Sequence, residues 1–393
     1  MASPWVTIIG LGEDGLAGLA DASRTALDGA EVIFGGPRHL ALIDAGARGR
    51  AWPVPFSVDP VLACRGQRVV VLASGDPFWF GAGGSLAAHL GPEQWVCHPA
   101  PSTFSRVAAR LGWRLEEVAC LGLHAAPVAR LLPHLRPGAK AICLLRDAAA
   151  VGELAGWLAS AGFGASQLSV MEALGGPRDR VRHVQASEFA LADVQAPVAV
   201  AVLVEGGRGL PRAPGLPDDA FAHDGQITRR CVRALTLMAL EPRRDLTLWD
   251  IGAGSGSVSV EWCLAGGRAV AVEPRADRCA NIAANIAQFG LEGRMVLSQG
   301  RVPDALTGLP PPEAVFVGGG LTAVTFAAIW SGLPTGTRLV TNAVTLETES
   351  LLMTLQAVHG GDLLRIDLAS AAPLGRMRGW TAQRPVVQWS VTR

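Results

Sequence analysis

The chain has 393 residues, which is long for one hydrophobic core and predicts two domains. Lys and Arg together number 34, and so do Asp and Glu, so no overall positive charge is available to attract nucleic acid or an anionic membrane. Apolar residues make up 49% and charged residues 17%, a composition typical of folded proteins. We therefore expect a folded protein with no nucleic-acid and no membrane partner.

The seven cysteines are scattered and never spaced as C-x-x-C, so we expect neither a disulfide framework nor a zinc site. His98, His124 and His223 also lack the spacing of metal ligands, and we predict no metal. The start of the chain lacks the pattern of a secretory signal, and no apolar run reaches the ~18 residues of a membrane span. These features predict a cytoplasmic protein.

Short β-branched runs alternate with Ala- and Leu-rich stretches of helical period through the first half of the chain. We expect strands at residues 6–9, 69–72, 141–145 and 198–204. Strands that alternate with helices predict an α/β domain. We place this domain at residues 1–205.

A segment dense in Gly and Pro, residues 206–217, interrupts both periods and predicts a linker. After it, a helix over residues 227–240 leads into a strand over 246–250, and strands and helices alternate again to Val391. The second α/β domain is therefore predicted at residues 218–393.

An acid followed by three alternating glycines, Asp-Ile-Gly-Ala-Gly-Ser-Gly at 250–256, ends the first strand of this second domain. Glycines allow positive φ and close approach to a ligand, and the helix expected from about Val258 presents free N–H groups. The next strand, 269–272, ends at Glu273, whose carboxylate can accept hydrogen bonds from both hydroxyls of a ribose. A dinucleotide loop reads G-x-G-x-x-G, so the G-x-G-x-G spacing here favours S-adenosylmethionine.

The second half is similar in these features to class I methyltransferases, which implies a Rossmann-like, seven-stranded, mostly parallel sheet. In methyltransferases of this type the loop after the third strand, here residues 297–303, contacts the adenine. The predicted cofactor-binding residues of this half are Thr228, Asp250, Gly252, Gly254, Gly256, Ser257, Glu273, Gly300 and Arg301. Gly318, Gly319 and Gly320 end a fourth strand, where substrate would enter. They form either a substrate-binding loop for a bulky planar ligand or a flexible turn.

The first half also begins with a glycine loop, Gly-Leu-Gly-Glu-Asp-Gly at 10–15, which matches G-x-G-x-x-G after a strand. This pattern makes an NAD-type domain an alternative. A dinucleotide fold needs an acid at the end of its second strand, yet the strand at 32–34 ends in Gly35-Gly36, and Glu31 stands at its beginning. The NAD interpretation therefore lacks its ribose anchor.

Two more loops follow strands in the first half: Gly75-Asp76-Pro77, and a turn from Pro99 that contains Ser102 and Thr103. The three motifs in this order resemble the tetrapyrrole methylase family, the class III methyltransferases. The resemblance implies a two-lobed domain that holds S-adenosylmethionine between its lobes. It assigns cofactor binding to Gly10, Gly12, Gly75, Asp76, Pro77, Ser102 and Thr103. Asp76 has an alternative role as the cap of the helix after it.

With the segment 215–221 and Gln226-Ile227-Thr228 between them, the two halves resemble the two-domain decarboxylating methyltransferases of cobalamin biosynthesis over nearly the whole chain. The resemblance implies transfer of methyl groups from two S-adenosylmethionine molecules to meso carbons C5 and C15 of a tetrapyrrole, precorrin-6Y or 6B. It also implies loss of carbon dioxide from the ring C acetate, which gives a precorrin-8-type product. C5 methylation falls to the first half, and C15 methylation with decarboxylation to the second. Both families tend to form homo-oligomers, and we expect one here.

No cluster of acids, bases and nucleophiles stands out as catalytic. A meso carbon conjugated to pyrrole nitrogens is already a nucleophile, so the protein must chiefly align it and exclude water. The catalytic candidates are Glu261, one turn into a helix, and Arg376 and Arg378 in an expected loop before the last strand. A helix-face carboxylate and a simple turn are the alternative interpretations. Guanidinium groups that could pair with substrate carboxylates are those of Arg229, Arg230, Arg233, Arg301, Arg376 and Arg378.

Three alternative functions are also compatible with the sequence. The chain could methylate another substrate, such as RNA or a different small molecule, although its zero net charge does not favour RNA. Its first half could be an NAD-type domain. That half could also be a non-catalytic module.

Overall fold

The computed structural model describes residues 4–393, which form two compact units. The first unit comprises residues up to 128 together with 134–209, and the second comprises 129–133 together with 210–393. The division at residues 209 and 210 falls within the segment predicted as a linker. Both units have α/β folds, as predicted.

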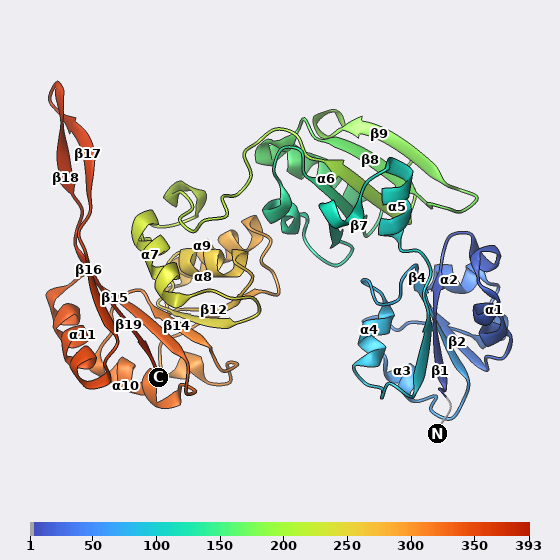
Figure 1. Cartoon of the computed structure of the whole chain (residues 1–393), viewed down its shortest axis with the longest axis horizontal. Helices are drawn as coiled ribbons and strands as arrows, with labels where there is room; N and C mark the ends of the chain where they lie inside the picture. Colours follow the sequence, from blue (N-terminus) through green and yellow to red (C-terminus); the bar gives the residue numbers. More distant parts are fainter. Residues whose placement is uncertain (1–3) are drawn as a thin grey trace. The chain divides into compact units, whose positions relative to one another are not determined.

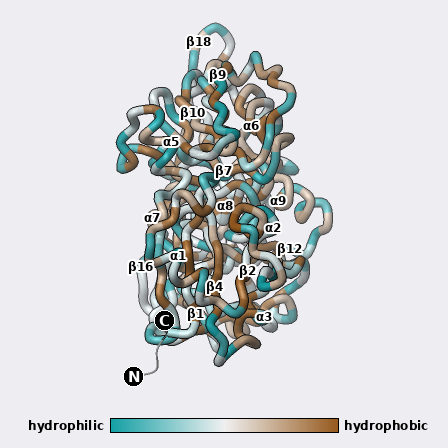
Figure 2. Tube along the Cα trace, turned by 90° about the vertical axis from the view of Figure 1, so that its right-hand side faces the viewer, coloured by the Kyte–Doolittle hydropathy of each residue, from teal (hydrophilic) through white to brown (hydrophobic). Residues whose placement is uncertain are grey.

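The first lobe of the first unit is a parallel sheet in the order β3-β2-β4-β1-β5. Its strands are β1 (Val6–Leu11), β2 (Val32–Gly35), β3 (Gly49–Ala51), β4 (Val69–Ser74) and β5 (Trp95–His98). Its helices are α1 (Asp21–Asp28), α2 (Pro37–Leu42), α3 (Asp59–Leu62) and α4 (Ala82–Ala87). Two hydrophobic clusters cover the two faces of the sheet, which explains the nearly continuous apolar runs of β1 and β4. Brown, apolar stretches mark these strands in Figure 2.

The second lobe of the first unit is a mixed sheet in the order β6-β7-β10-β8-β9, in which only β6 and β7 pair in parallel. Its strands are β6 (Val118–Gly122), β7 (Lys140–Leu145), β8 (Gln167–Glu172), β9 (Arg180–Gln185) and β10 (Val198–Leu203). Its helices are α5 (Thr103–Leu111) and α6 (Ala149–Leu158). The predicted strands 141–145 and 198–204 are therefore confirmed, and the antiparallel partners complete the lobe (Figure 1).

The second unit is built on a seven-stranded sheet in the order β13-β12-β11-β14-β15-β19-β16, in which the first five strands run parallel. The strands are β11 (Thr247–Ile251), β12 (Arg268–Glu273), β13 (Met295–Gln299), β14 (Ala314–Val317), β15 (Arg338–Ala343), β16 (Asp362–Ile366) and β19 (Val386–Thr392). The helices are α7 (Arg230–Leu240), α8 (Ser257–Leu264), α9 (Ala276–Gln288), α10 (Ala323–Gly332) and α11 (Leu346–His359). α7, α8 and α9 contribute to one hydrophobic cluster and α10 and α11 to another, so helices cover both faces of the sheet.

The prediction of a loop before the last strand is wrong. The chain forms an antiparallel hairpin of β17 (Ala369–Leu374) and β18 (Met377–Ala382), which extends beyond the seven-stranded sheet (red in Figure 1). Gly375 takes a φ of +61° and, with Arg376, makes the turn. Among residues 4–393 these two strands pair with no third strand, and most of their side chains are exposed, so the sequence there lacks a buried apolar pattern.

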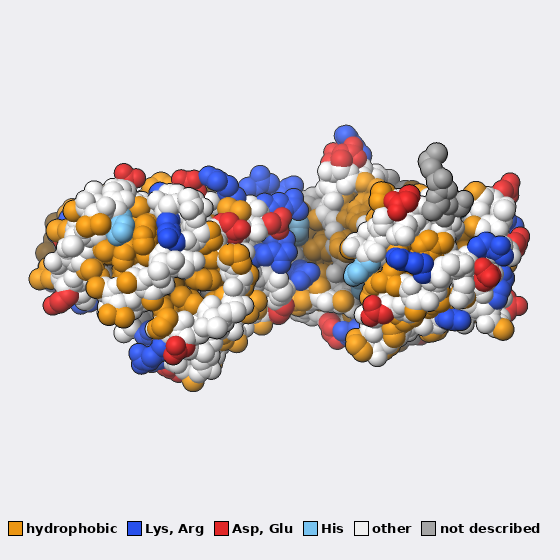
Figure 3. Space-filling view, turned by 90° about the horizontal axis from the view of Figure 1, so that it is seen from below, with side chains coloured by type: hydrophobic (Ala, Val, Ile, Leu, Met, Phe, Trp, Pro, Cys, Tyr) orange, Lys and Arg blue, Asp and Glu red, His pale blue; other side chains and the backbone are white. Residues whose placement is uncertain are grey.

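The surface of the molecule is mixed in character. The face shown in Figure 3 carries acidic and basic side chains with exposed hydrophobic atoms between them. In residues 4–393 no helix combines the length and the apolar character needed to cross a membrane.

Candidate active sites

A cavity of about 720 Å³ lies in the first unit, and residues of both lobes line it. This volume is in the range of pockets that bury a small molecule. Four residues predicted to bind the cofactor line it: Gly12, Gly75, Ser102 and Thr103. Its other walls include the aromatic side chains of Trp52, Phe56, Trp79 and Phe80.

The three loops of the first-half motif meet in space. A Cβ atom on Gly10 would overlap the carbonyl oxygen of Gly75 and lie 2.5 Å from the backbone nitrogen of Ala100. A Cβ on Gly75, whose φ is +55°, would lie 2.8 Å from the Cα of Ser102. Gly10 therefore lets β1 pack against the two other loops, and glycine is required there because backbone occupies the space of a side chain.

Asp76 and Pro77 support this arrangement from within their own turn and are not among the residues that line the cavity. The Asp76 carboxylate accepts a hydrogen bond from the backbone N–H of Phe78 at 2.9 Å, and the carbonyl of Pro77 accepts one from Gly83 N–H at 2.9 Å. The alternative role of Asp76 as a helix cap is not observed, because Gly81 occupies the cap position of α4.

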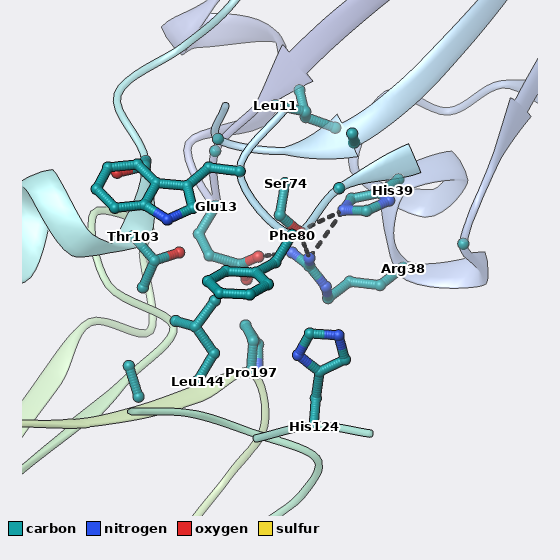
Figure 4. Close-up of a pocket in the computed structure, with 18 of the residues that line it drawn as sticks. Leu11, Glu13, Arg38, His39, Ser74, Phe80, Thr103, His124, Leu144 and Pro197 are labelled. Carbon is teal, nitrogen blue, oxygen red and sulfur yellow. Dashed lines mark hydrogen bonds and ion pairs between the residues drawn. The ribbon is translucent and has the colours of Figure 1, made fainter. Parts of the chain in front are cut away.

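A charged cluster around the buried Glu13, which sequence reasoning missed, lies beside the glycine loop of the first unit (Figure 4). Glu13 is buried and pairs with Arg38, and its other oxygen lies 3.6 Å from Arg178. The Nε2 atom of His39 lies 2.9 Å from both the Arg38 guanidinium and the Ser74 hydroxyl. Burial, and then the charge of Arg38, lower the pKa of His39 to about 4, so its ring is neutral near pH 7. An acid at the variable position 13 of the glycine loop was the available signal.

The glycine loop of the second unit has the backbone that its sequence predicts. Gly252, Gly254 and Gly256 have φ values of +67°, +61° and +69°, in the left-handed region that favours glycine. A Cβ on Gly252 would be 3.8 Å from the carbonyl oxygen of Gly319, and one on Gly318 would be 3.6 Å from that of Gly252. The structure therefore brings the triple glycine 318–320 next to the predicted cofactor loop.

Two buried acids frame that loop. Asp250 is 1% exposed, and its Oδ2 accepts hydrogen bonds from the Ser259 backbone N–H and hydroxyl at 3.3 and 2.7 Å. Within residues 4–393, its Oδ1 has no hydrogen-bond partner. Glu273 accepts hydrogen bonds from the backbone N–H groups of Gly254 and Arg275 at 2.9 and 3.0 Å. The unpartnered buried oxygen and the space beside Gly252 fit a ligand that donates hydrogen bonds, as S-adenosylmethionine does.

The other predicted cofactor residues of the second unit are Ser257, Gly300, Arg301 and Thr228. Gly300 donates its N–H to the Glu273 carbonyl at 3.1 Å, which sets the loop after β13 beside the end of β12. Arg301 follows on that loop and is exposed. Ser257 is buried as the first residue of α8. Thr228 precedes α7, and its carbonyl accepts a hydrogen bond from the Arg233 guanidinium at 2.5 Å.

Asp250 gives the second unit a distinctive pH dependence. Burial, together with the negative charge of Glu273, raises the pKa of Asp250 to about 6 against an ordinary value of 3.8, although bonds from Ser259 oppose the shift. Between these values the folded protein holds a proton that the unfolded chain has released. The contribution of Asp250 to the free energy of unfolding therefore falls by roughly 3 kcal/mol in total as pH rises from about 4 to about 6. Above that pH the contribution stays low.

Asp250→Asn removes this titration. In urea unfolding of the full chain, we expect the stability of the Asn variant relative to the wild type to increase between about pH 4.5 and about pH 7.5. If the two proteins differ in free energy of unfolding by the same amount across that interval, Asp250 is already ionised at the lower pH.

Glu261 and Arg233 have structural roles, in contrast to the catalytic and carboxylate-binding roles considered for them. The Arg233 side chain is fully buried, and its Nε donates to a Glu261 oxygen at 2.6 Å. The same carboxylate accepts the backbone N–H groups of Gly215 and Leu216 at 2.5 and 3.0 Å. The pair therefore fixes the end of the predicted linker onto α7 and α8, and neither charge is free for substrate.

Replacing Glu261 by Gln should destabilise the second unit by about 1.5–3 kcal/mol, because the buried Arg233 loses its buried carboxylate partner and keeps an ion pair only with the partly exposed Asp218. Urea unfolding measures this loss. The folded fraction of the variant should keep its methyl-transfer rate at low temperature. A large loss of rate in a variant with wild-type stability would instead make Glu261 catalytic.

The other candidate arginines lie at the surface or bind backbone. Arg376 and Arg378 are exposed on the β17–β18 hairpin. Arg229 is exposed and lies 3.6 Å from Asp218, and Arg230 donates from Nε to the Gly215 carbonyl at 2.6 Å. Arg301 differs from these arginines because it follows Gly300 on the loop after β13, where cofactor binding is predicted.

Family models match both halves of the chain. The model of tetrapyrrole (corrin/porphyrin) methylases matches residues 6–190, and the precorrin methyltransferase domain matches residues 219–393. The resemblance of the first half to tetrapyrrole methylases is thus confirmed, and the NAD-type alternative loses its basis. Residues 191–218 lie between the two matches.

Curated relatives extend over the whole chain. A precorrin-6Y C(5,15)-methyltransferase [decarboxylating] of Sinorhizobium sp is 46% identical over 404 residues, covering 100% of this chain and 97% of the relative. A Mycobacterium tuberculosis (strain CDC 1551 / Oshkosh) protein of the same name is 39% identical over 401 residues, covering 99% of this chain and 100% of the relative. A probable cobalt-precorrin-6B C(15)-methyltransferase (decarboxylating) of Pyrobaculum calidifontis is 35% identical over 183 residues, covering 44% of this chain and 93% of the relative. The chain belongs to the family of decarboxylating precorrin-6Y C(5,15)-methyltransferases.

Proposed function

We propose that the chain methylates C5 and C15 of a precorrin-6Y- or 6B-type tetrapyrrole and removes carbon dioxide from its ring C acetate, giving a precorrin-8-type product. The observation that carries this proposal is the presence of two separate glycine-loop sites on one chain of this family. Each site has its own acids and its own glycine backbone. One chain can therefore perform two different methyl transfers.

S-adenosylmethionine supplies an electrophilic methyl group at each site. In the first unit, the cavity between the two lobes would hold it, in contact with Gly12, Gly75, Ser102 and Thr103. In the second unit, Asp250 and Glu273 would accept its hydrogen bonds, with Gly252 and Gly254 leaving room for it. The protein's task is then to hold the meso carbon in line with that methyl group and to exclude water.

We assign C5 methylation to the first unit and C15 methylation with decarboxylation to the second. The Pyrobaculum relative named for the C(15) reaction and decarboxylation aligns over 183 residues, about the length of one half of this chain. The triple glycine beside the second glycine loop leaves backbone open to a bulky ring. Loss of carbon dioxide leaves its electron pair with the acetate carbon, and a proton completes the methyl group that remains.

Titration with S-adenosylhomocysteine tests the two-site proposal. Calorimetry of the wild-type chain should give two molecules bound per chain, and Glu273→Ala should reduce the number to one. A wild-type stoichiometry of one would contradict a second methyl-donor site.

We also propose that the chain acts in the cytoplasm as a homo-oligomer whose copies meet through the β17–β18 hairpin. Its cysteines are free thiols, in keeping with a reducing compartment. The hairpin exposes Leu374, Met377 and Trp380, the last by 79%, and β16 forms the open edge of the sheet. Light scattering should show an oligomer for the wild type and a smaller species for Trp380→Glu; a monomeric wild type would contradict the proposal.

A further inference from the structure

Phe80 combines two unfavourable features at one position in the first-unit cavity. Its side chain is 52% exposed, although it is a large apolar ring. Its backbone φ is +58°, in the left-handed region that residues with a Cβ atom rarely adopt. Residues held in such conformations concentrate at ligand sites, where surrounding structure maintains them.

The second lobe makes room for this ring. A Cβ atom on Gly122, the last residue of β6, would lie 2.9 Å from Cδ1 of Phe80 and 3.2 Å from Cε1 of His124. Any side chain at position 122 would therefore displace the Phe80 ring. Figure 4 shows the ring in the cavity, with Thr103 and His124 among the residues around it.

The ring also lies close to the predicted methyl-donor site. Its centroid is 5.9 Å from that of Phe104, which follows Ser102 and Thr103 in the predicted cofactor turn. Phe80 therefore extends from the cofactor turn toward Gly122 of the second lobe. A ligand packed on its exposed face would lie next to the methyl donor.

We propose that Phe80 positions the tetrapyrrole in the first unit, by packing its exposed face against the conjugated macrocycle so that a meso carbon is held beside the methyl donor. This inference rests on the proposed function. Aromatic rings gain from offset stacking beyond the burial of their area. Phe56, Trp79 and Phe80 are all exposed in the same cavity, which is more aromatic surface than one adenine ring covers.

Binding can be measured without methyl transfer. The conjugated substrate absorbs light, so its binding near Trp79 and Trp52 should quench tryptophan emission. Without methyl donor and under anaerobic conditions, a precorrin-6B-type tetrapyrrole should quench the wild type saturably. Phe80→Ala and Phe80→Gly should raise Kd about tenfold, and Phe80→Tyr should change it by less than about twofold.

Comparing Phe80→Ala with Phe80→Gly separates the effect of losing the ring from the effect of backbone strain. Alanine is strained at φ +58° and glycine is not, so a common loss of affinity would come from the missing ring. Phe78→Ala is the matched control, because Phe78 is an exposed aromatic two residues away that packs on Trp95 and is not among the residues lining the cavity. Its Kd should equal that of the wild type.

Gly122→Ala provides an independent variant outside the loop. Its Cβ should displace the ring and raise Kd as Phe80→Gly does, while the double variant should bind no more weakly than Phe80→Gly alone. Additive losses would show that Gly122 acts apart from Phe80 and would contradict the arrangement.

The remaining outcomes distinguish failure of the proposed function from failure of the role of Phe80. If the wild type shows no quenching, the proposed function fails for this unit, and the inference falls with it. If the wild type shows quenching that Trp52→Phe with Trp79→Phe removes, and the Phe80 variants keep its Kd, the positioning role alone is wrong. With the second site disabled by Glu273→Ala, Phe80→Gly should leave S-adenosylhomocysteine affinity unchanged. Loss of that affinity instead would make Phe80 a methyl-donor contact.

Discussion

Replacing Gly10 by alanine should abolish methyl transfer by the first unit while the second unit continues to work. The new Cβ would overlap the Gly75 carbonyl and lie 2.5 Å from the Ala100 nitrogen, so the loops of the first site must separate. Displacement of about 1 Å is enough to reduce such a reaction about 100-fold. We expect at least that loss for C5 methylation. Mass spectrometry should find a product with one added methyl group and one lost carbon dioxide.

Gly156→Ala is the matched control for this substitution. Gly156 lies within α6, and nothing lies within 4 Å of a Cβ placed there. Alanine favours helix more than glycine does, so this variant should be slightly stabilised and fully active. If Gly10→Ala adds both methyl groups at the wild-type rate, the first glycine loop does not form a methyl-donor site.

Replacing Glu273 by alanine should have the converse effect. The Glu273 carboxylate holds the N–H groups of Gly254 and Arg275, and at the end of β12 it is placed to accept the ribose hydroxyls of the methyl donor. Hydrogen bonds to a charged group contribute about 1.5–3 kcal/mol each, so losing two should weaken binding to the second unit by about 100-fold or more. The product should carry one methyl group, at C5, and keep its carboxylate.

The control for Glu273 lies at the opposite end of the same sheet. Glu313 accepts the backbone N–H of Thr247 at 2.7 Å, at the start of β11, and is exposed. Glu313→Ala removes a carboxylate of the same kind beside the start of β11, at the opposite end of this strand from the glycine loop. It should leave both methylations unchanged. Decarboxylated product from Glu273→Ala at the wild-type rate would show that the second glycine loop is not needed.

Much of the fold could be predicted from the sequence because parallel strands buried on both faces leave apolar runs with clear ends. β1, which contains Gly10, β4, which precedes Gly75, and β11, which contains Asp250, are of this kind. The glycine loops follow directly from them, since both the turn and the close approach need glycine. The helix expected from residue 227 begins only at Arg230, because Arg229 is still extended.

The rest could not be predicted, because it depends on which elements meet. Arg233 and Glu261 lie 28 positions apart, and only the packing of α7 on α8 brings their charges together in a buried pair. The cluster of Glu13, Arg38 and Arg178 similarly joins residues of two lobes. The β17–β18 hairpin has no hydrophobic face that rests on a core, so it lacks the periodic signal of the other strands.

The most direct test is mass spectrometry of a precorrin-6B-type substrate incubated anaerobically with the wild-type chain and methyl-labelled S-adenosylmethionine. We predict a product that has gained two labelled methyl groups and lost one carbon dioxide. Gain of methyl groups with the carboxylate retained would contradict the decarboxylating role proposed for the second unit. Gain of a single methyl group by the wild type would contradict two active sites on one chain.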